Sequence, residues 1–272
     1  MTAMNWRWPT PDGRLPSAVP LAVISAVLVL AASAWLIEVS PVRLWQAGPR
    51  LIAFAGHLFT TPDWAYVPRL AEKMLETIEM TVLATFLALL LAFPLGVLAA
   101  HNASPHPIIF QMARTLLSSI RALPDMVVAL LFVSALGLGA LPGILALALV
   151  TVGFMGKFIA EAIEVVGTRS IEGLSAAGAG RWQRIQYAML PQAMPDFIGS
   201  LLYILDHNLR AAAVLGLVGA GGIGYDLVMA MRLFDYGRIS LIALSIYIVV
   251  TLLDRMSAWL RGRVLGRRVN VH

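Results

Sequence analysis

The segment Glu172-Gly-Leu-Ser-Ala-Ala-Gly178 lies between two apolar stretches, and polar and kinking residues follow it: Arg181, Trp182, Arg184 and Leu190-Pro191. A span that faces lipid does not tolerate so many polar groups. We therefore expect a short helix, a turn at Gly178 and a second short helix on a membrane surface. Glycine permits the backbone of a sharp turn, and a helix ends readily before a proline. This shape suits docking to a partner.

The ends of the two short helices are predicted from local chemistry. Ser170 is expected to cap the first helix, with Glu172 in its first turn, where the helix dipole favours a negative charge. The second helix is expected to stop before Pro191. An ordinary amphipathic helix at the membrane interface would explain Trp182 and the arginines equally well.

The composition places this segment in a membrane protein. Hydrophobic residues make up 59% of the 272 residues, charged residues 13%, and the mean hydropathy is +0.81, against about 45–50% and about 25% in soluble domains. Absence of cysteine excludes disulfides and thiolate metal sites. We predict an all-α, polytopic membrane protein with about six transmembrane helices of roughly 20 residues each, at 18–37, 77–100, 108–138, 143–164, 197–216 and 239–260.

Two of these spans carry helix-breaking residues. The second contains Pro94 and Gly96, and the third is interrupted at Arg121-Ala-Leu-Pro124-Asp125. Proline kinks or breaks helices, and lipid tolerates the break only beside protein or water. We therefore expect the third, fourth and fifth spans to surround a pathway. The first span is peripheral, and we expect a retained helix rather than a cleaved signal peptide.

The lysines and arginines predict the orientation. With a cytoplasmic N-terminus and six crossings, most of them fall on the cytoplasmic side, as the positive-inside rule requires. Both termini and the segment 170–191 are then cytoplasmic. The net charge of +5 reflects this topology and gives no reason to expect nucleic acid as a partner; the basic stretch 261–268 could also attract anionic membrane lipid.

The chain resembles a known family at several points. The spacing of Glu172, Gly178 and Leu190-Pro191 resembles the coupling loop of binding-protein-dependent ABC importer permeases. Further stretches are similar to phosphonate-type members: Gly156 to Ile163, Tyr187 to Gln192, Arg210 to Gly224 and Arg232 to Arg238. The resemblance implies a type I ABC importer permease fold for the transmembrane domain at 71–272. The N-terminal segment at 1–70, with the first transmembrane helix and an outer loop, resembles no particular family.

The resemblance also implies function and partners. It implies a permease subunit in the cytoplasmic (inner) membrane of a bacterium, translocating phosphonate or a related phosphorus oxyanion such as phosphite or a phosphate ester. The partners would be a second copy of the chain, a cytoplasmic ABC ATPase dimer and a periplasmic or lipid-anchored phosphonate-binding protein. Cofactors are expected on the ATPase alone, as ATP and Mg. The residues expected to couple to the ATPase are Glu172, Gly173, Ser175, Ala176, Ala177, Gly178, Arg181, Leu190 and Pro191.

Polar residues inside the fifth span are candidates for the pathway. Asp206, Asn208 and Arg210 lie where charge is costly. Asp206 and Arg210 are four residues apart and share a helix face, so an internal ion pair competes with the interpretation that Arg210 binds a passing anion through its guanidinium.

The glycines that follow are candidates for an outer gate. Gly219, Gly221, Gly222 and Gly224 satisfy G-x-G-x-x-G, yet they follow a membrane span and lack the βαβ context of a dinucleotide site. We expect a flexible outer loop where a delivery protein docks; the alternative is a tight turn for close helix packing.

Three other functions have less support in the sequence. A methionine or quaternary-amine importer of the same family has less support, because Arg210 and its flanking residues are phosphonate-like. A proton-coupled secondary transporter using Asp206, Glu161 and Glu164 predicts an internal repeat, and none is evident. An intramembrane enzyme needs a nucleophile with a base, or a metal cluster; we expect no catalytic residues and no metal site.

Overall fold

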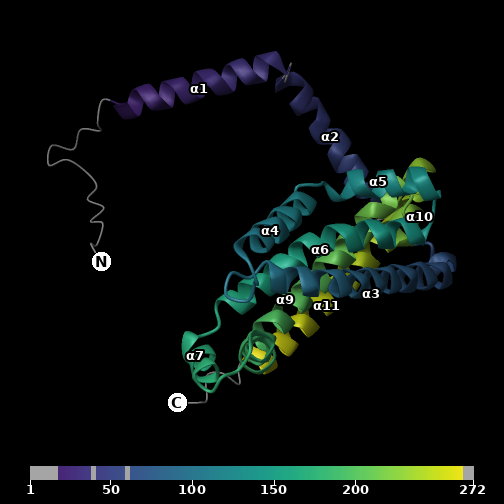
Figure 1. Cartoon of the computed structure of the whole chain (residues 1–272). Coiled ribbons are helices and arrows are strands. Elements are labelled where there is room, and N and C mark those ends of the chain that lie inside the picture. The colour runs from purple at the N-terminus through teal and green to yellow at the C-terminus, as the bar shows by residue number, and fades with distance from the viewer. Residues whose placement is uncertain (1–17, 38–40, 59–61, 266–272) are drawn as a thin grey trace. The chain divides into compact units, whose positions relative to one another are not determined.

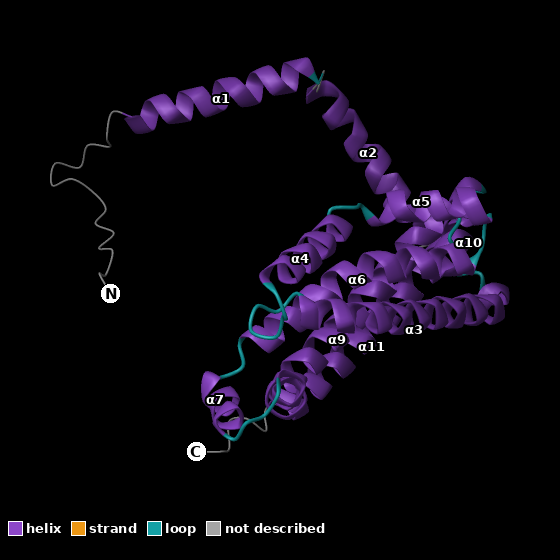
Figure 2. Ribbon diagram, viewed as in Figure 1, coloured by secondary structure: helices purple, strands orange, loops and turns teal. Residues whose placement is uncertain are grey.

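The computed structural model describes residues 18–37, 41–58 and 62–265. All regular structure in these residues is helical (Figure 2), which confirms the all-α prediction. Five helices are long and apolar enough to cross a membrane, and a bent helix pair brings the number to six. Contacts divide the chain after His57 into two units, which we describe separately.

The N-terminal unit contains two helices. α1 (Ala18–Leu36) is an unbroken apolar helix of 19 residues, about 28 Å long at 1.5 Å per residue, which matches a bilayer core of about 30 Å. α2 (Pro41–Leu58) is a helix within the expected outer loop. Pro41 stands at its first position, where proline pre-sets the helical φ angle and loses no hydrogen bond.

The second unit is a helical bundle built around α6 (Ala140–Glu164). In the part of α6 that is long enough to span a membrane, 67% is buried inside the bundle. Small residues let its neighbours approach closely, as is typical of helix packing in membranes. A Cβ on Gly156 would lie 2.6 Å from Leu117, and one on Gly96 would lie 2.7 Å from the Cβ of Ile159. The fourth predicted span is therefore confirmed as an inner helix.

The third predicted span is broken where expected. α4 (Pro107–Arg121) and α5 (Asp125–Leu136) meet at an angle of 82°. Pro124 occupies the N-cap of α5 with an extended backbone, because proline disfavours continuation of the preceding helix. α4 begins after His106, whose ring nitrogen accepts a hydrogen bond from the Ile108 amide at 3.2 Å.

Two spans begin earlier than predicted. α3 runs over Val67–Leu98 and α9 over Leu190–Leu215. The first turns of α3 contain charged residues, so their hydropathy is too low to be predicted as part of a membrane span. Two of these residues, Lys73 and Glu76, form an ion pair at 2.6 Å. α3 also continues through Pro94. Pro94 cannot donate to the carbonyl of Leu90 one turn back, yet the helix runs on for four residues to Leu98.

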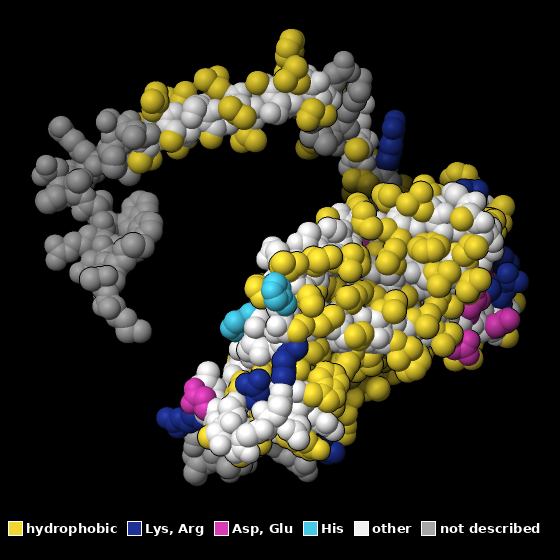
Figure 3. All heavy atoms as spheres, in the orientation of Figure 1, with side chains coloured by type: hydrophobic (Ala, Val, Ile, Leu, Met, Phe, Trp, Pro, Cys, Tyr) yellow, Lys and Arg dark blue, Asp and Glu magenta, His cyan; other side chains and the backbone are white. Residues whose placement is uncertain are grey.

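The remaining elements lie mainly at the two ends of the bundle (Figure 1). α7 (Thr168–Ala176), α8 (Arg181–Arg184) and a π-helical turn (Ile185–Met189) form what we call the α7 end. A short 3-10 turn (Gly216–Val218) and α10 (Gly222–Arg232) form the α10 end, and α11 (Tyr236–Leu265) runs along the bundle. Figure 3 shows a broad apolar surface on the bundle, with charged side chains towards both ends.

Candidate functional site

The turn at Gly178 is a helix C-cap of defined geometry. The Gly178 amide donates to the Ser175 carbonyl at 3.0 Å, and the Ala179 amide donates to the Leu174 carbonyl at 2.9 Å. Gly178 has φ +80°, and this left-handed glycine together with the two hydrogen bonds forms a Schellman motif. The predicted glycine turn is confirmed, and its conformation is one that favours glycine over any residue with a Cβ.

The helix before this turn offers a small and accessible surface. α7 has no buried residue. Glu172 is exposed and has no ion-pair partner among the described residues, and the neighbouring small residues are exposed as well: Gly173, Ser175, Ala176, Ala177 and Gly178. Apart from Ile171, which packs partly buried against the core of the bundle, this helix has most of its surface free for another molecule. We call residues 168–184 the elbow.

Hydrogen bonds tie the elbow to the bundle. Arg181 donates through its guanidinium to the Ala103 carbonyl, with Nε at 2.8 Å. In the same α3–α4 loop, the Asn102 amide group donates to the Ile163 carbonyl at 2.9 Å, and the His101 amide donates to Glu164 at 2.8 Å. A displacement of the elbow would thus reach α3, α4 and α6. The sequence analysis missed this link, because it joins loops 78 residues apart.

Three local predictions about the elbow are wrong. α7 begins at Thr168 after Gly167, so Ser170 does not cap it and Glu172 is not in its first turn. The extended backbone of Gly167 (ψ 136°) starts the helix earlier. Pro191 does not end a helix either, since α9 begins at Leu190. The Leu190 amide donates five residues back to Ile185, and this wider π turn accommodates a proline that cannot donate.

The three polar candidates of α9 do not form one site. Asp206 and Arg210 form an ion pair, as their spacing predicted, and the Arg210 guanidinium lies 3.6 Å from Asp254 of α11. Asn208 is buried on another face. It accepts from the Thr151 hydroxyl and donates to the Thr85 hydroxyl, each at 3.0 Å, so it links α9 to α3 and α6.

The glycine-rich segment after α9 is a compact turn, which is the alternative that the sequence left open. Gly219 has φ +87°, and a Cβ there would lie 2.2 Å from Leu138. A Cβ on Gly224 would lie 1.8 Å from the Ala213 carbonyl. The Gly222 amide donates to Glu76 at 3.1 Å. These contacts fix the start of α10 against α3 and α9.

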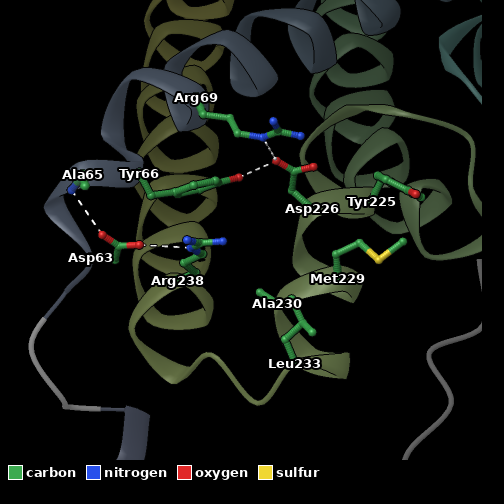
Figure 4. Close-up of a pocket in the computed structure, with 10 residues that line it drawn as sticks. All are labelled: Asp63, Ala65, Tyr66, Arg69, Tyr225, Asp226, Met229, Ala230, Leu233 and Arg238. Atoms are coloured by element: carbon green, nitrogen blue, oxygen red, sulfur yellow. Dashed lines mark hydrogen bonds and ion pairs between the residues drawn. The ribbon is translucent and has the colours of Figure 1, made fainter.

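A pocket of about 430 Å³ lies at the α10 end (Figure 4). The Tyr66 hydroxyl donates to Asp226 at 2.6 Å, and Arg69 approaches the same carboxylate at 3.1 Å. Across the pocket, Arg238 donates to Asp63 at 3.0 Å. The sequence analysis did not find this pocket, because its two walls are more than 150 residues apart in the chain. Within the described residues, no cluster of three acidic, histidine or cysteine side chains could hold a metal.

Comparisons with solved structures support the fold. The chain is similar to a chain in an inward-facing structure of the MetNI methionine ABC transporter, with a TM-score of 0.66 and 20% identity over 74% of this chain and 99% of that one. A chain of an amino acid ABC transporter solved with histidines gives a TM-score of 0.63 at 18% identity, over 73% of this chain and 95% of that one. At these identities the likeness concerns the fold alone, and it confirms the predicted importer permease fold.

Curated relatives are more similar in sequence. The phosphite transport system permease protein PtxC of Stutzerimonas stutzeri is 37% identical over 89% of this chain and 87% of its own length. The phosphate-import permease protein PhnE of Mycolicibacterium smegmatis is 39% identical over 70% of this chain, which spans 36% of that protein. The model of the family described as "Binding-protein-dependent transport system inner membrane component" matches residues 92–266. The chain is therefore a member of this family of multi-pass inner membrane permeases.

Proposed function

We propose that this chain is the membrane-spanning subunit of an ATP-driven importer that carries a phosphorus oxyanion, such as phosphite or a phosphonate, into the bacterial cytoplasm. The similarity to the phosphite permease over 89% of this chain carries the substrate class, and a permease protein named for a phosphonate transport system is 41% identical over 43% of the chain. The exposed elbow supports a role in receiving force from a partner. In this proposal, ATP is hydrolysed by the partner ATPase and not by this chain.

The elbow is the proposed docking site for the ATPase. Its small side chains allow close approach, Glu172 offers an unpaired charge, and the Schellman turn holds the surface in one shape. Because Arg181 is hydrogen bonded to the α3–α4 loop, movement of the ATPase would tilt α4 and α6. The ATPase would carry the ATP and Mg.

The proposed orientation places the α7 end in the cytoplasm and the α10 end outside. Arg169, Arg181 and Arg184 lie at the α7 end, and an excess of arginine favours the cytoplasmic side. The α10 end then faces the substrate-binding protein. Its pocket of paired charges and the compact glycine turn are the proposed contact and gate.

We further propose a homodimer, because one elbow in each chain supplies the two docking sites that an ATPase dimer needs. A dimer with a paralogous permease is the competing assembly; Stutzerimonas stutzeri has related permease proteins named HtxC and HtxE. Native mass spectrometry of the purified complex distinguishes two copies of this chain from one copy of each of two chains.

The test is ATP hydrolysis by the complex of this chain with its ATPase, reconstituted in lipid nanodiscs. Binding protein loaded with phosphite or methylphosphonate should stimulate hydrolysis, whereas binding proteins loaded with methionine or glycine betaine should not. If hydrolysis is stimulated by binding protein loaded with methionine or glycine betaine, and not by binding protein loaded with phosphite or methylphosphonate, the assigned substrate class is contradicted. The chain reconstituted without its ATPase is the control and should hydrolyse no ATP.

A further inference from the structure

A cavity of about 280 Å³ lies between the ends of α3, α4 and α6. Its polar lining is Arg114, Ser118, Arg121 and Lys157. A groove of about 420 Å³ along α4 shares Arg114 and Ser118 and continues past Gln111, Thr115 and Ser119. We call the cavity and the groove together the α4 vestibule. The cavity by itself is small for a drug-sized ligand and suits a small ion with a few waters.

The helix that forms the vestibule is unusual for a membrane span. Residues 99–124 contain no aspartate or glutamate, whereas α4 itself contains Arg114 and Arg121. Serine, threonine and glutamine occupy one exposed face, and Leu117 and Ala113 pack inward. Polar groups on this scale do not face lipid, so this side of α4 lies against water or protein. The fixed charges of α4 make that space attractive to anions.

Arg121 is the most informative residue of the vestibule. It ends α4 halfway through the broken span, and it has no carboxylate partner among the described residues. Its guanidinium lies 5.4 Å from the centre of the Phe154 ring. A Cβ on Gly153 would lie 3.0 Å from the Arg121 amide nitrogen, so close packing of α4 on α6 holds the cation there. An unpaired cation within a span is a functional-site hypothesis by default.

The two other cations have carboxylates on the side towards the α7 end. Arg114 lies 3.3 Å from Glu164, and Lys157 lies 3.4 Å from Glu161. Both cations remain partly exposed, at 42% of their side-chain surface. Three cations against two carboxylates leave the vestibule positive, and Arg121 supplies the unbalanced charge.

The vestibule adjoins a second cavity deeper in the bundle. This cavity of about 120 Å³ is mainly apolar, and its polar lining residues are Asp125, Thr151, His207 and Asn208; Phe154 forms part of its apolar wall. Phe154 lies under the Arg121 guanidinium, so the same contact borders both cavities. An ion leaving the middle of the bundle would meet Arg121 first and Lys157 and Arg114 afterwards.

We propose that the α4 vestibule is an oxyanion-binding site, in which Arg121 and Lys157 attract the transported ion. A guanidinium matches the geometry of phosphonate and phosphite oxygens. Binding is weak, because conduction requires release. This inference deepens the proposed function and rests on it for the identity of the ion.

The experiment exploits the absence of cysteine from the chain. Ser118→Cys places one thiol in the vestibule of the full chain in nanodiscs of zwitterionic lipid. Its rates of modification by an anionic and by a cationic methanethiosulfonate reagent are compared. The same two rates are measured at Ser170→Cys, an exposed position on α7, as a reference. Relative to that reference, the anionic reagent should react faster than the cationic one at Ser118→Cys. Inorganic phosphite and methylphosphonate should protect the thiol, and choline at equal ionic strength should not.

Charge variants identify the cause. Arg121→Gln and Lys157→Gln, each combined with Ser118→Cys, should lower the ratio of anionic to cationic rates by about 25-fold, because one charge at about 4 Å in water changes each rate about fivefold and in opposite directions. Arg169→Gln is the matched control, because it removes an exposed positive charge outside the vestibule, and it should leave the ratio unchanged. Equal ratios in all three variants would overturn the proposal.

Three further results separate the alternatives. If protection requires anionic lipid and free phosphite has no effect, the vestibule holds a lipid headgroup and the proposal fails. If the charge variants have no effect while phosphite still stimulates ATP hydrolysis by the complex, the vestibule assignment fails and the proposed function stands. If phosphite protects the thiol but stimulates no hydrolysis, the anion site stands and the proposed function fails.

Discussion

Replacement of Gly178 by alanine tests the elbow with the least disturbance to the rest of the bundle. The φ of Gly178 is +80°, and an added Cβ would meet nothing within 4 Å. The whole penalty is therefore conformational, and a left-handed conformation costs a residue with a Cβ about 1–2 kcal/mol. This corresponds to a five- to thirtyfold lower population of the closed turn.

The penalty should be confined to the elbow, because α7 buries no side chain. Hydrogen exchange of the Gly178 and Ala179 amides, whose bonds close the turn, should accelerate in Gly178→Ala by about five- to thirtyfold, as expected for local opening. Amides of α6 should be unchanged. In the complex, substrate uptake for each ATP hydrolysed should fall.

A matched control lies two residues away. Gly180 has φ −66°, which alanine adopts without strain, and the nearest atom to an added Cβ is 3.7 Å away. Gly180→Ala should leave exchange and uptake at the level of the unmodified protein. The reasoning is refuted if Gly178→Ala exchanges at the unmodified rate, or if both variants lose the fold equally.

Other predictions concern the bundle and the candidate residues. Asn208→Leu removes two interhelical hydrogen bonds and should lower the thermal stability in detergent by about 1–2 kcal/mol; unchanged melting would show that these bonds contribute nothing. Gly96→Val places atoms where a Cβ already lies 2.7 Å from Ile159 and should reduce the folded fraction in the membrane by fluorescence-detected chromatography, at a cost of about 1–3 kcal/mol. Arg210→Ala should impair anion uptake at unchanged abundance; an equal loss of protein on immunoblots would favour a purely structural ion pair with Asp206. Glu172→Gln should lower uptake per ATP while the melting temperature is retained, and normal uptake would contradict its coupling role.

The sequence predicted the features that depend on local chemistry. The helical class, the number of spans, the break before Pro124 and the turn at Gly178 all follow from hydropathy, proline and glycine. The Asp206–Arg210 pair follows from a spacing of four residues on one helix. The resemblance to importer permeases was likewise confirmed by the family match at residues 92–266.

Features that depend on tertiary contacts were missed or misplaced. Asn208 was predicted to lie in one site with Arg210, yet the two residues face different neighbours. Asn208 contacts Thr85 and Thr151, whereas Arg210 contacts Asp254. Single-helix spacing does not reveal which neighbours surround a helix. The start of α3 was placed too late, because an ion pair between Lys73 and Glu76 offsets charges that a hydropathy criterion rejects.

The domain division at residue 70 and the assignment of the coupling residues stay predictions. Contacts divide the chain after His57, but this division concerns packing and not function. The contacts of Gly219 and Gly224 show a compact turn where a flexible loop was expected, and the outer position and the gate role stay predictions. No pattern in a single sequence distinguishes a flexible loop from a turn that glycine allows to pack closely.

The central claim is that the elbow docks to the ATPase, and a single cross-link tests it most directly. Ala176→Cys places one thiol on the exposed surface of α7, and Met231→Cys places one at the opposite α10 end. A short cysteine-to-lysine cross-linker applied to the reconstituted complex should join Ala176→Cys to the ATPase, with a yield that changes when ATP is bound, and should not join Met231→Cys. A cross-link to the ATPase from Met231→Cys alone would contradict the account.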